Sequence, residues 1–192
     1  MKTVARFPLV GKFMLALMLV CMSTLTLAST PDENRAKVRK QSQEVLERLY
    51  AAQPSSRAAI ANSKGYATFS NWGLTLGPVG GGIGKGLAVS MPSGSDTFMR
   101  YVEGSAGLGV GIKKYDLVFV FDTEKAYADF VNKGWQAGAR ATFAAKRGEK
   151  GNAYDGAGSV SNGVWVYLLT EKGLAAEIGL KGTKYYKDKS LN

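Results

Sequence analysis

The chain contains no histidine and a single cysteine, Cys21, among its 192 residues. Without histidine it cannot build a Ser-His-Asp or Cys-His catalytic unit, and no imidazole is available to bind a metal. A lone cysteine excludes an internal disulfide and a zinc site made of thiolates. Acidic residues are also few: the chain has 15 acidic and 25 basic residues, which gives a formal net charge of +10. We therefore expect no cofactor, and an anionic partner fits this charge.

The overall composition is that of a folded domain rich in glycine. Hydrophobic residues make up 45% of the chain and charged residues 21%, which excludes a disordered polyelectrolyte and a multi-span membrane protein. Glycine occupies 24 positions, well above the background of roughly 7%. This surplus of glycine is the feature of the composition that needs a structural explanation.

Residues 1–28 have the three regions of a secretory signal. An apolar run of ten residues spans 13–22, and small residues at 26 and 28 flank Leu27 at the expected cleavage site. A retained membrane anchor would need about 20 apolar residues. The basic residues that precede the run are Lys2, Arg6 and Lys12. We predict cleavage after Ala28 and a periplasmic or extracellular location.

Lipidation at Cys21 is the alternative to this cleavage. The residue before it, Val20, is bulkier than the small residue that usually precedes a lipidated cysteine. Removal of residues 1–28 leaves 164 residues without cysteine and with a formal charge of +7. A chain of this length is expected to fold as one domain with a single core.

The segment 29–62 contains no glycine and has helical spacing. Thr30–Glu33 provides a capping hydroxyl, a proline and two acidic residues for a helix start, and Pro54 ends the helix. A shorter helical stretch is expected over 55–62. The apolar and small residues that recur at helical spacing are Val38, Ser42, Val45, Leu46, Leu49 and Ala52.

Within residues 63–192, several segments alternate between apolar and polar residues with a period of two. This pattern predicts that 63–192 is the β-rich part of the domain. A helix is predicted over 122–132, closed by Gly134. Few helices separate the strands, which favours an α+β fold: a mainly antiparallel sheet or barrel-like body with an N-terminal helix and one or two further helices. Strands are expected at 66–72, 99–103, 117–121, 164–169 and 174–180.

Two glycine runs alternate with other residues and so place their glycines on one face of a strand. They comprise Gly80, Gly82, Gly84 and Gly86, and Gly107, Gly109 and Gly111. A phosphate-binding Walker loop would need glycine where Val79 stands and a hydroxyl where Gly86 stands. The runs therefore favour close packing of backbone or barrel curvature over nucleotide binding.

A hydrolase with paired carboxylates is the enzymatic alternative that survives the absence of histidine. Nothing in the spacing of the acidic residues selects a pair, and caps, turns and surface positions explain them equally well. The candidates are Asp96, Glu103, Asp116, Asp122, Asp155 and Glu177.

The basic residues cluster and suit a binding role. Near an anionic membrane each lysine or arginine is attracted by about 1 kcal/mol. The N-terminal helix is amphipathic, and its apolar stripe either meets lipid or covers the β body. Nucleic acid is not expected for a secreted chain without an RNA- or DNA-binding motif. The predicted lipid-binding residues are Arg35, Lys37, Arg39, Lys40, Lys113, Lys114, Lys146 and Arg147.

Several segments, in order, resemble motifs of the SYLF domain family between about Val38 and Lys189. Residues 63–72 are similar to its KGYAVFPN opening and 115–121 to its YDLVLVF strand. The other matching segments are 81–86, 134–145 and 171–182. Two positions differ from the family: Arg140 stands where aspartate is common, and 143–147 replaces a glycine-proline continuation.

The resemblance implies binding of membrane lipids, notably phosphoinositides, by the domain and its preceding helix. Some eukaryotic members bind actin, a partner not expected outside the cell, and the family has no catalytic residues to carry over. Our first hypothesis is therefore non-enzymatic binding of an anionic phospholipid surface. An envelope module that binds a protein partner is the second hypothesis, and the carboxylate hydrolase is the third.

Overall fold

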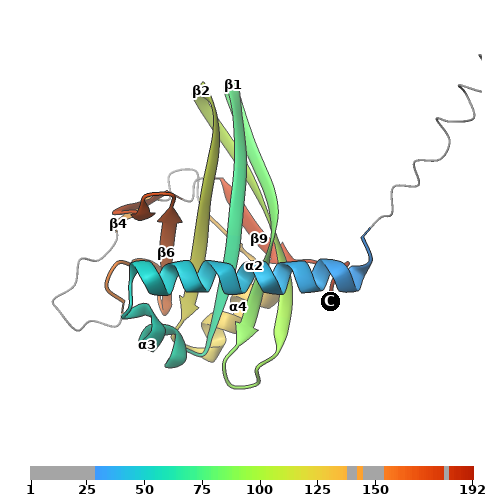
Figure 1. The fold of residues 1–192 in the computed structure, drawn as a ribbon, viewed down its shortest axis with the longest axis vertical. Helices are drawn as coiled ribbons and strands as arrows, with labels where there is room; N and C mark the ends of the chain where they lie inside the picture. The colour runs from blue at the N-terminus through green and yellow to red at the C-terminus, as the bar shows by residue number, and fades with distance from the viewer. Residues whose placement is uncertain (1–28, 138–141, 145–153, 180–181) are drawn as a thin grey trace, which may run out of the picture. The chain divides into compact units, whose positions relative to one another are not determined.

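A curled antiparallel sheet carries helices on both of its faces in the unit formed by residues 31–192 (Figure 1). The computed structural model describes residues 29–137, 142–144, 154–179 and 182–192. Only the backbone is described for residues 72–79, 105–113, 142–144 and 177–179. The predicted signal lies outside the described residues. Within them, no helix is long and apolar enough to cross a membrane.

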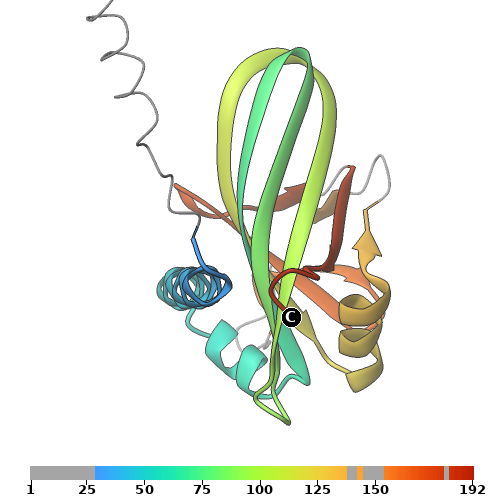
Figure 2. The same cartoon turned by 90° about the vertical axis from the view of Figure 1, so that its right-hand side faces the viewer.

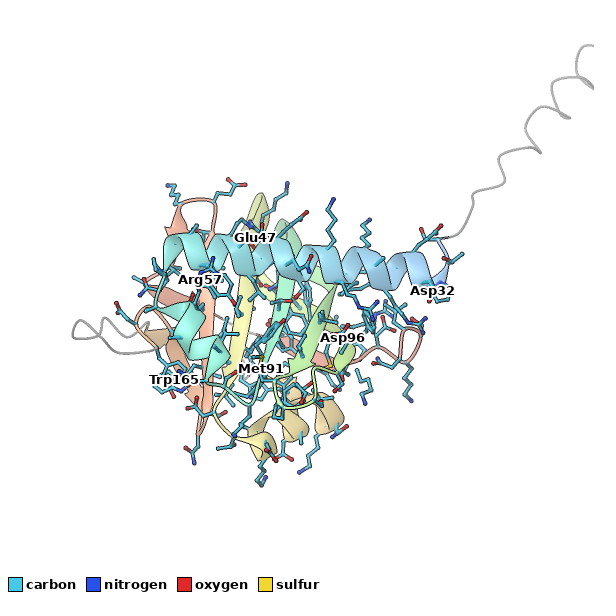
Figure 3. All side chains as sticks on the ribbon, turned by 60° about the horizontal axis from the view of Figure 1, so that its bottom comes forward. Asp32, Glu47, Arg57, Met91, Asp96 and Trp165 are labelled. Carbon is cyan, nitrogen blue, oxygen red and sulfur yellow. The ribbon has the colours of Figure 1, made fainter. Side chains whose placement is uncertain are left out.

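Two long strands form a ribbon that is the centre of the fold. β1 (Gly65–Ser90) and β2 (Asp96–Phe121) pair in antiparallel register from Gly65–Phe121 to Val89–Asp96. A register shift between Gly77 and Val79 marks an irregularity near the middle of β1. Figure 2 shows the ribbon rising away from the helices, bending over and returning to the body. Each strand therefore contributes two limbs to the sheet.

The free edge of β2 pairs with a different strand on each limb. Residues 116–121 pair with β6 (Val164–Thr170), and residues 99–103 pair with β9 (Thr183–Lys187). The short strands complete the seven-stranded sheet and a separate two-stranded sheet: β3 (Trp135–Gln136) on β9, β5 (Gly158–Ser161) and β7 (Gly173–Leu174) on β6, and β4 (Thr142–Ala144) with β8 (Glu177–Gly179).

An aromatic core fills the inside of the curled sheet. Phe69 and Phe119 pack edge-on against Tyr185, with ring centroids 4.7 and 5.1 Å away. α4 (Glu124–Lys133) closes this side with Phe130, which is also buried. The Thr123 hydroxyl accepts the first-turn amide of α4, so this helix begins with a side-chain cap.

The opposite face of the sheet is covered by α2 (Pro31–Ala52) and α3 (Ser56–Ala61), as Figure 2 shows for α2 and α4 on opposite sides. Val45 and Leu49 of α2 pack against Val118 and Val120 of β2, while the Thr68 hydroxyl donates to Ser42. The apolar stripe of α2 thus lies inside the fold, and its charged residues face outward. The sequence left two roles open for this stripe, contact with lipid or coverage of the β body. The structure shows that it covers the β body.

Two glycines of the first alternating run lie where the interior leaves no room for a side chain. A Cβ on Gly84 would overlap the ring of Tyr101, and one on Gly86 would overlap the ring of Phe69. Both rings belong to the aromatic core. The prediction of close packing is therefore confirmed at these two positions.

The α+β class, the antiparallel sheet and the N-terminal helix with two further helices agree with the sequence prediction. The strand lengths do not. The predicted strands 66–72, 99–103 and 117–121 are parts of two strands of 26 residues each. The predicted strand 174–180 is divided between β7 and β8. The two 26-residue strands also include the glycine-rich stretches, whose alternating glycines fit a strand and whose backbones pair in the same register, with one shift between Gly77 and Val79.

Candidate lipid-binding surface

The predicted basic residues at the start of α2 are mostly paired with acidic groups. Arg35 donates from Nη1 to Asp32 and from Nε to the carbonyl of Leu191, both at 2.7 Å. Arg39 donates to Asp96 at 2.6 Å, and its guanidinium lies 5.1 Å from the ring centre of Phe98. These two arginines join α2 to the sheet as much as they offer charge to a partner.

The two lysines of this cluster are more open. Lys37 is exposed. The Lys40 ammonium lies 3.9 Å from the Glu44 carboxylate, and both side chains are well exposed. Such an exposed pair is weak and is readily exchanged for another anion. The outward face of α2 is therefore basic mainly at Lys37 and Lys40.

Of the other four predicted lipid-binding residues, the structure describes the side chain of Lys114 alone. Lys114 is exposed on β2, where it lines a cavity together with Arg48 of α2. Arg48 lies 13 residues, or about 20 Å of helix, from Arg35, so Lys114 belongs to another part of the surface. For Lys113 only the backbone is described, and Lys146 and Arg147 lie outside the described residues.

A surface that the sequence analysis missed lies on the sheet beyond the N-terminal end of α2. Three large apolar side chains are exposed there: Ile83 to 72%, Val102 to 41% and Tyr186 to 36%. Ile83 of β1 pairs with Val102 of β2, and Val102 pairs with Lys184 of β9. Ile83, Val102 and Lys184 therefore lie side by side in one row across β1, β2 and β9.

The next row of the same face is basic. Lys85 pairs with Arg100, and Arg100 pairs with Tyr186. The Lys85 ammonium donates to the Asn34 side chain of α2 at 3.1 Å, and Arg100 lies 3.8 Å from the buried Asp188. We call these six residues the outer patch: Ile83, Lys85, Arg100, Val102, Lys184 and Tyr186.

Only the register reveals the outer patch, because its rows join segments far apart in the chain. The local signal is weak but visible: apolar and basic residues alternate as Ile83 and Lys85, as Arg100 and Val102, and as Lys184 and Tyr186. In a strand such pairs share one face. Isolated exposed apolar residues are ordinary, but a cluster bordered by cations indicates an interaction surface.

Comparisons with known proteins agree with the motifs. Residues 102–192 match the family model described as "Ysc84: Las17-binding protein actin regulator", which is the SYLF domain. Beta cell expansion factor A of Aeromonas veronii is 29% identical over 164 residues, covering 84% of this chain. Residues 102–192 therefore form a SYLF-type domain. The resemblance found in the sequence is confirmed, and the chain spans 60% of the length of that relative.

SYLF domains are generally binding domains, and four of the candidate carboxylates have structural partners in this one: Asp96, Glu103, Asp116 and Asp122. Asp96 pairs with Arg39, and the Tyr115 hydroxyl donates to Glu103 at 2.5 Å. Asp122 accepts from the Trp165 indole at 2.8 Å. In the described part of the chain, no group of three or more acidic or cysteine side chains could hold a metal ion.

Asp116 is the most deeply buried of these acids that has a cation beside it. Its side chain is 5% exposed and pairs with Arg48. Burial raises the pKa of the Asp116 carboxyl above its ordinary value, while hydrogen bonding by Ser70 and the charge of Arg48 act in the opposite direction. A buried carboxylate needs such a partner, so this ion pair has a structural role in holding α2 against the sheet.

Proposed function

We propose that this SYLF protein binds the surface of anionic phospholipid membranes and catalyses no reaction. The observation that carries the proposal is the outer patch, where exposed apolar side chains stand beside cations on one sheet face. Family membership supports a binding role in general. Export, predicted from residues 1–28, would bring the chain to the lipids of the cell envelope.

Both parts of the outer patch contribute to binding in this proposal. The apolar side chains, of which Ile83 is the most exposed, gain about 25 cal/mol for each Å² of apolar surface removed from water. Lys85 and Lys184 each add about 1 kcal/mol of attraction near anionic headgroups. A surface with one contribution alone would bind weakly, and the combination selects membranes with negative charge.

Helix α2 has a supporting role in this proposal. Because its apolar stripe is buried, it offers lipid its charged face, with Lys37 and Lys40 exposed. Lys85 contacts Asn34 of α2, which places the start of the helix next to the outer patch. Basic residues of the helix can therefore add to the same attraction without the helix entering the membrane.

Vesicle co-sedimentation tests the proposal. The protein is mixed with phosphatidylcholine vesicles that contain or lack phosphatidylglycerol, at low and high salt. We expect binding only with phosphatidylglycerol and a loss of binding as salt screens the charges. Replacing Lys85 and Lys184 together by alanine removes about 2 kcal/mol of attraction, or roughly a 30-fold loss of partition at low salt.

The matched control removes two lysines from another surface. Lys125 and Lys133 both pair with Asp129 on α4, across the sheet from α2, so their replacement by alanine should leave vesicle binding nearly unchanged. A third variant, Ile83→Ser, tests the apolar part. Equal binding to neutral and anionic vesicles would refute the proposal, and absence of vesicle binding with capture of a stoichiometric envelope protein would favour the partner-binding alternative.

A further inference from the structure

A polar cavity lies between α2 and the sheet, at the point where β6 ends. Its volume is about 320 Å³. This volume is within the range of small-ligand sites in proteins. The lining residues that matter for its chemistry are Gln41, Arg48, Ser70, Lys114, Asp116 and Glu171.

The inner wall of the cavity is a fixed ion pair. Asp116 is almost completely buried and holds Arg48, whose own side chain remains 57% exposed. A guanidinium carries five N–H donors, so pairing with one carboxylate leaves donors for a ligand. The Ser70 hydroxyl lies beside this pair among the lining residues. This part of the wall is built to hold an anionic group such as phosphate or carboxylate.

The outer wall adds one charge of each sign. Lys114 lies on β2 two residues before Asp116, and Glu171 lies in the turn that follows β6. Both side chains belong to exposed residues, and neither forms an ion pair within the described parts of the chain. The lining of the cavity thus includes one exposed cation and one exposed anion besides the Arg48–Asp116 pair.

The four charged residues of the lining sum to zero, and this balance restricts the ligand. A bare anion would meet the carboxylates of Asp116 and Glu171, and a bare cation would meet Arg48 and Lys114. A molecule with both charges satisfies both pairs of residues. Buried or partly buried charges are favourable only when each is matched in this way.

We infer that the cavity binds a small zwitterion, with its phosphate or carboxylate toward Arg48 and Lys114 and its ammonium group toward Glu171. Phosphoethanolamine has this chemistry, either as a free molecule or as the headgroup of an aminophospholipid. None of these residues belongs to the outer patch. The inference therefore stands or falls separately from membrane binding through that patch.

Calorimetric titration of the purified protein tests the inference with three probes: phosphoethanolamine, inorganic phosphate and ethanolamine. We expect saturable binding of phosphoethanolamine with a Kd of about 1 mM or lower, and at least tenfold weaker binding of the two fragments. Lys114→Ala and Glu171→Gln should each weaken phosphoethanolamine binding about tenfold. Both sites are exposed, so thermal unfolding of these variants should match the wild type and exclude a folding defect.

Lys172→Ala is the matched control, because Lys172 is an exposed lysine next to Glu171 that does not line the cavity. It should bind like the wild type. Equal affinity for phosphate and phosphoethanolamine, or wild-type binding by both cavity variants, would overturn the inference.

Vesicles of phosphatidylethanolamine and of phosphatidylcholine distinguish the two sources of the ligand. If the source is a lipid, binding to phosphatidylethanolamine vesicles falls in the Lys114→Ala and Glu171→Gln variants and persists when Lys85 and Lys184 are replaced. If the source is a free molecule, only the soluble probe responds to the cavity variants. Failure of both the soluble probe and the vesicles would also overturn the inference.

Discussion

Replacing Leu49 by alanine tests whether α2 is part of the folded body or a segment free to enter lipid. Leu49 is fully buried between α2 and the sheet, in contact with the cluster around Val118 and Val120. Leucine-to-alanine changes at such sites lower the free energy of unfolding by 2–5 kcal/mol, and we expect about 3 kcal/mol here. For a domain of this size that corresponds to a fall in Tm of about 6 to 12 °C.

Urea unfolding followed by far-UV circular dichroism measures this change, with Glu47→Ala as the control on the exposed side of the same helix. The control should change the free energy of unfolding by no more than about 0.5 kcal/mol. Vesicle binding of the two variants is measured in parallel. A docked helix predicts that Leu49→Ala lowers stability and leaves membrane affinity unchanged in the folded protein.

The opposite pattern would refute the reasoning. If Leu49→Ala lowered the free energy of unfolding by less than about 1 kcal/mol and weakened vesicle binding, the stripe of α2 would face lipid and not the sheet. The outer patch would then be a secondary contact. The experiment thus separates the two roles that the sequence left open for this helix.

Two further predictions concern the interior and the buried acid. Gly86→Ala should lower the free energy of unfolding by about 1–3 kcal/mol, because its Cβ would overlap the Phe69 ring, whereas Gly104→Ala has open space and should be nearly neutral in the same urea titration. The raised pKa of Asp116 means that the folded state holds its proton more tightly than the unfolded state, so its contribution to stability falls as pH rises above about 4. Asp116→Asn should therefore gain stability relative to the wild type between pH 4 and 7, and a relative loss over that range would show that attraction by Arg48 outweighs burial.

Much of the fold follows from local patterns in the sequence. The stripe of Val38, Val45 and Leu49 has helical spacing and lies on the buried face of α2. The helix after Asp122 begins and ends near its predicted bounds because Thr123 and Gly134 are strong local signals. Such elements depend on contacts within a few residues, and a sequence shows these directly.

The candidate surface depends on contacts that a sequence does not show. Ile83 and Lys184 are about a hundred residues apart, and only the register of β1, β2 and β9 brings them into one row. Arg39 looks like a free cation in the sequence, but Asp96, 57 residues away, pairs with it. Counting charges along the chain therefore overestimated the α2 cluster and missed the outer patch.

The contact between Arg35 and Leu191 has a consequence for the order of folding. These residues are 156 positions apart in the chain. The β1–β2 hairpin, in contrast, can start pairing next to the short turn at 91–95, where the paired residues are close in sequence. Contacts of long sequence separation pay more loop-closure entropy and form late. During synthesis, Leu191 is made long after Val38 of α2. The apolar cluster of Val38, Leu87, Phe98 and Leu191 is therefore complete only after the C-terminal segment has been made. The hairpin can therefore form early, and the first turns of α2, around Arg35 and Val38, complete their contacts only when the C-terminal segment has docked.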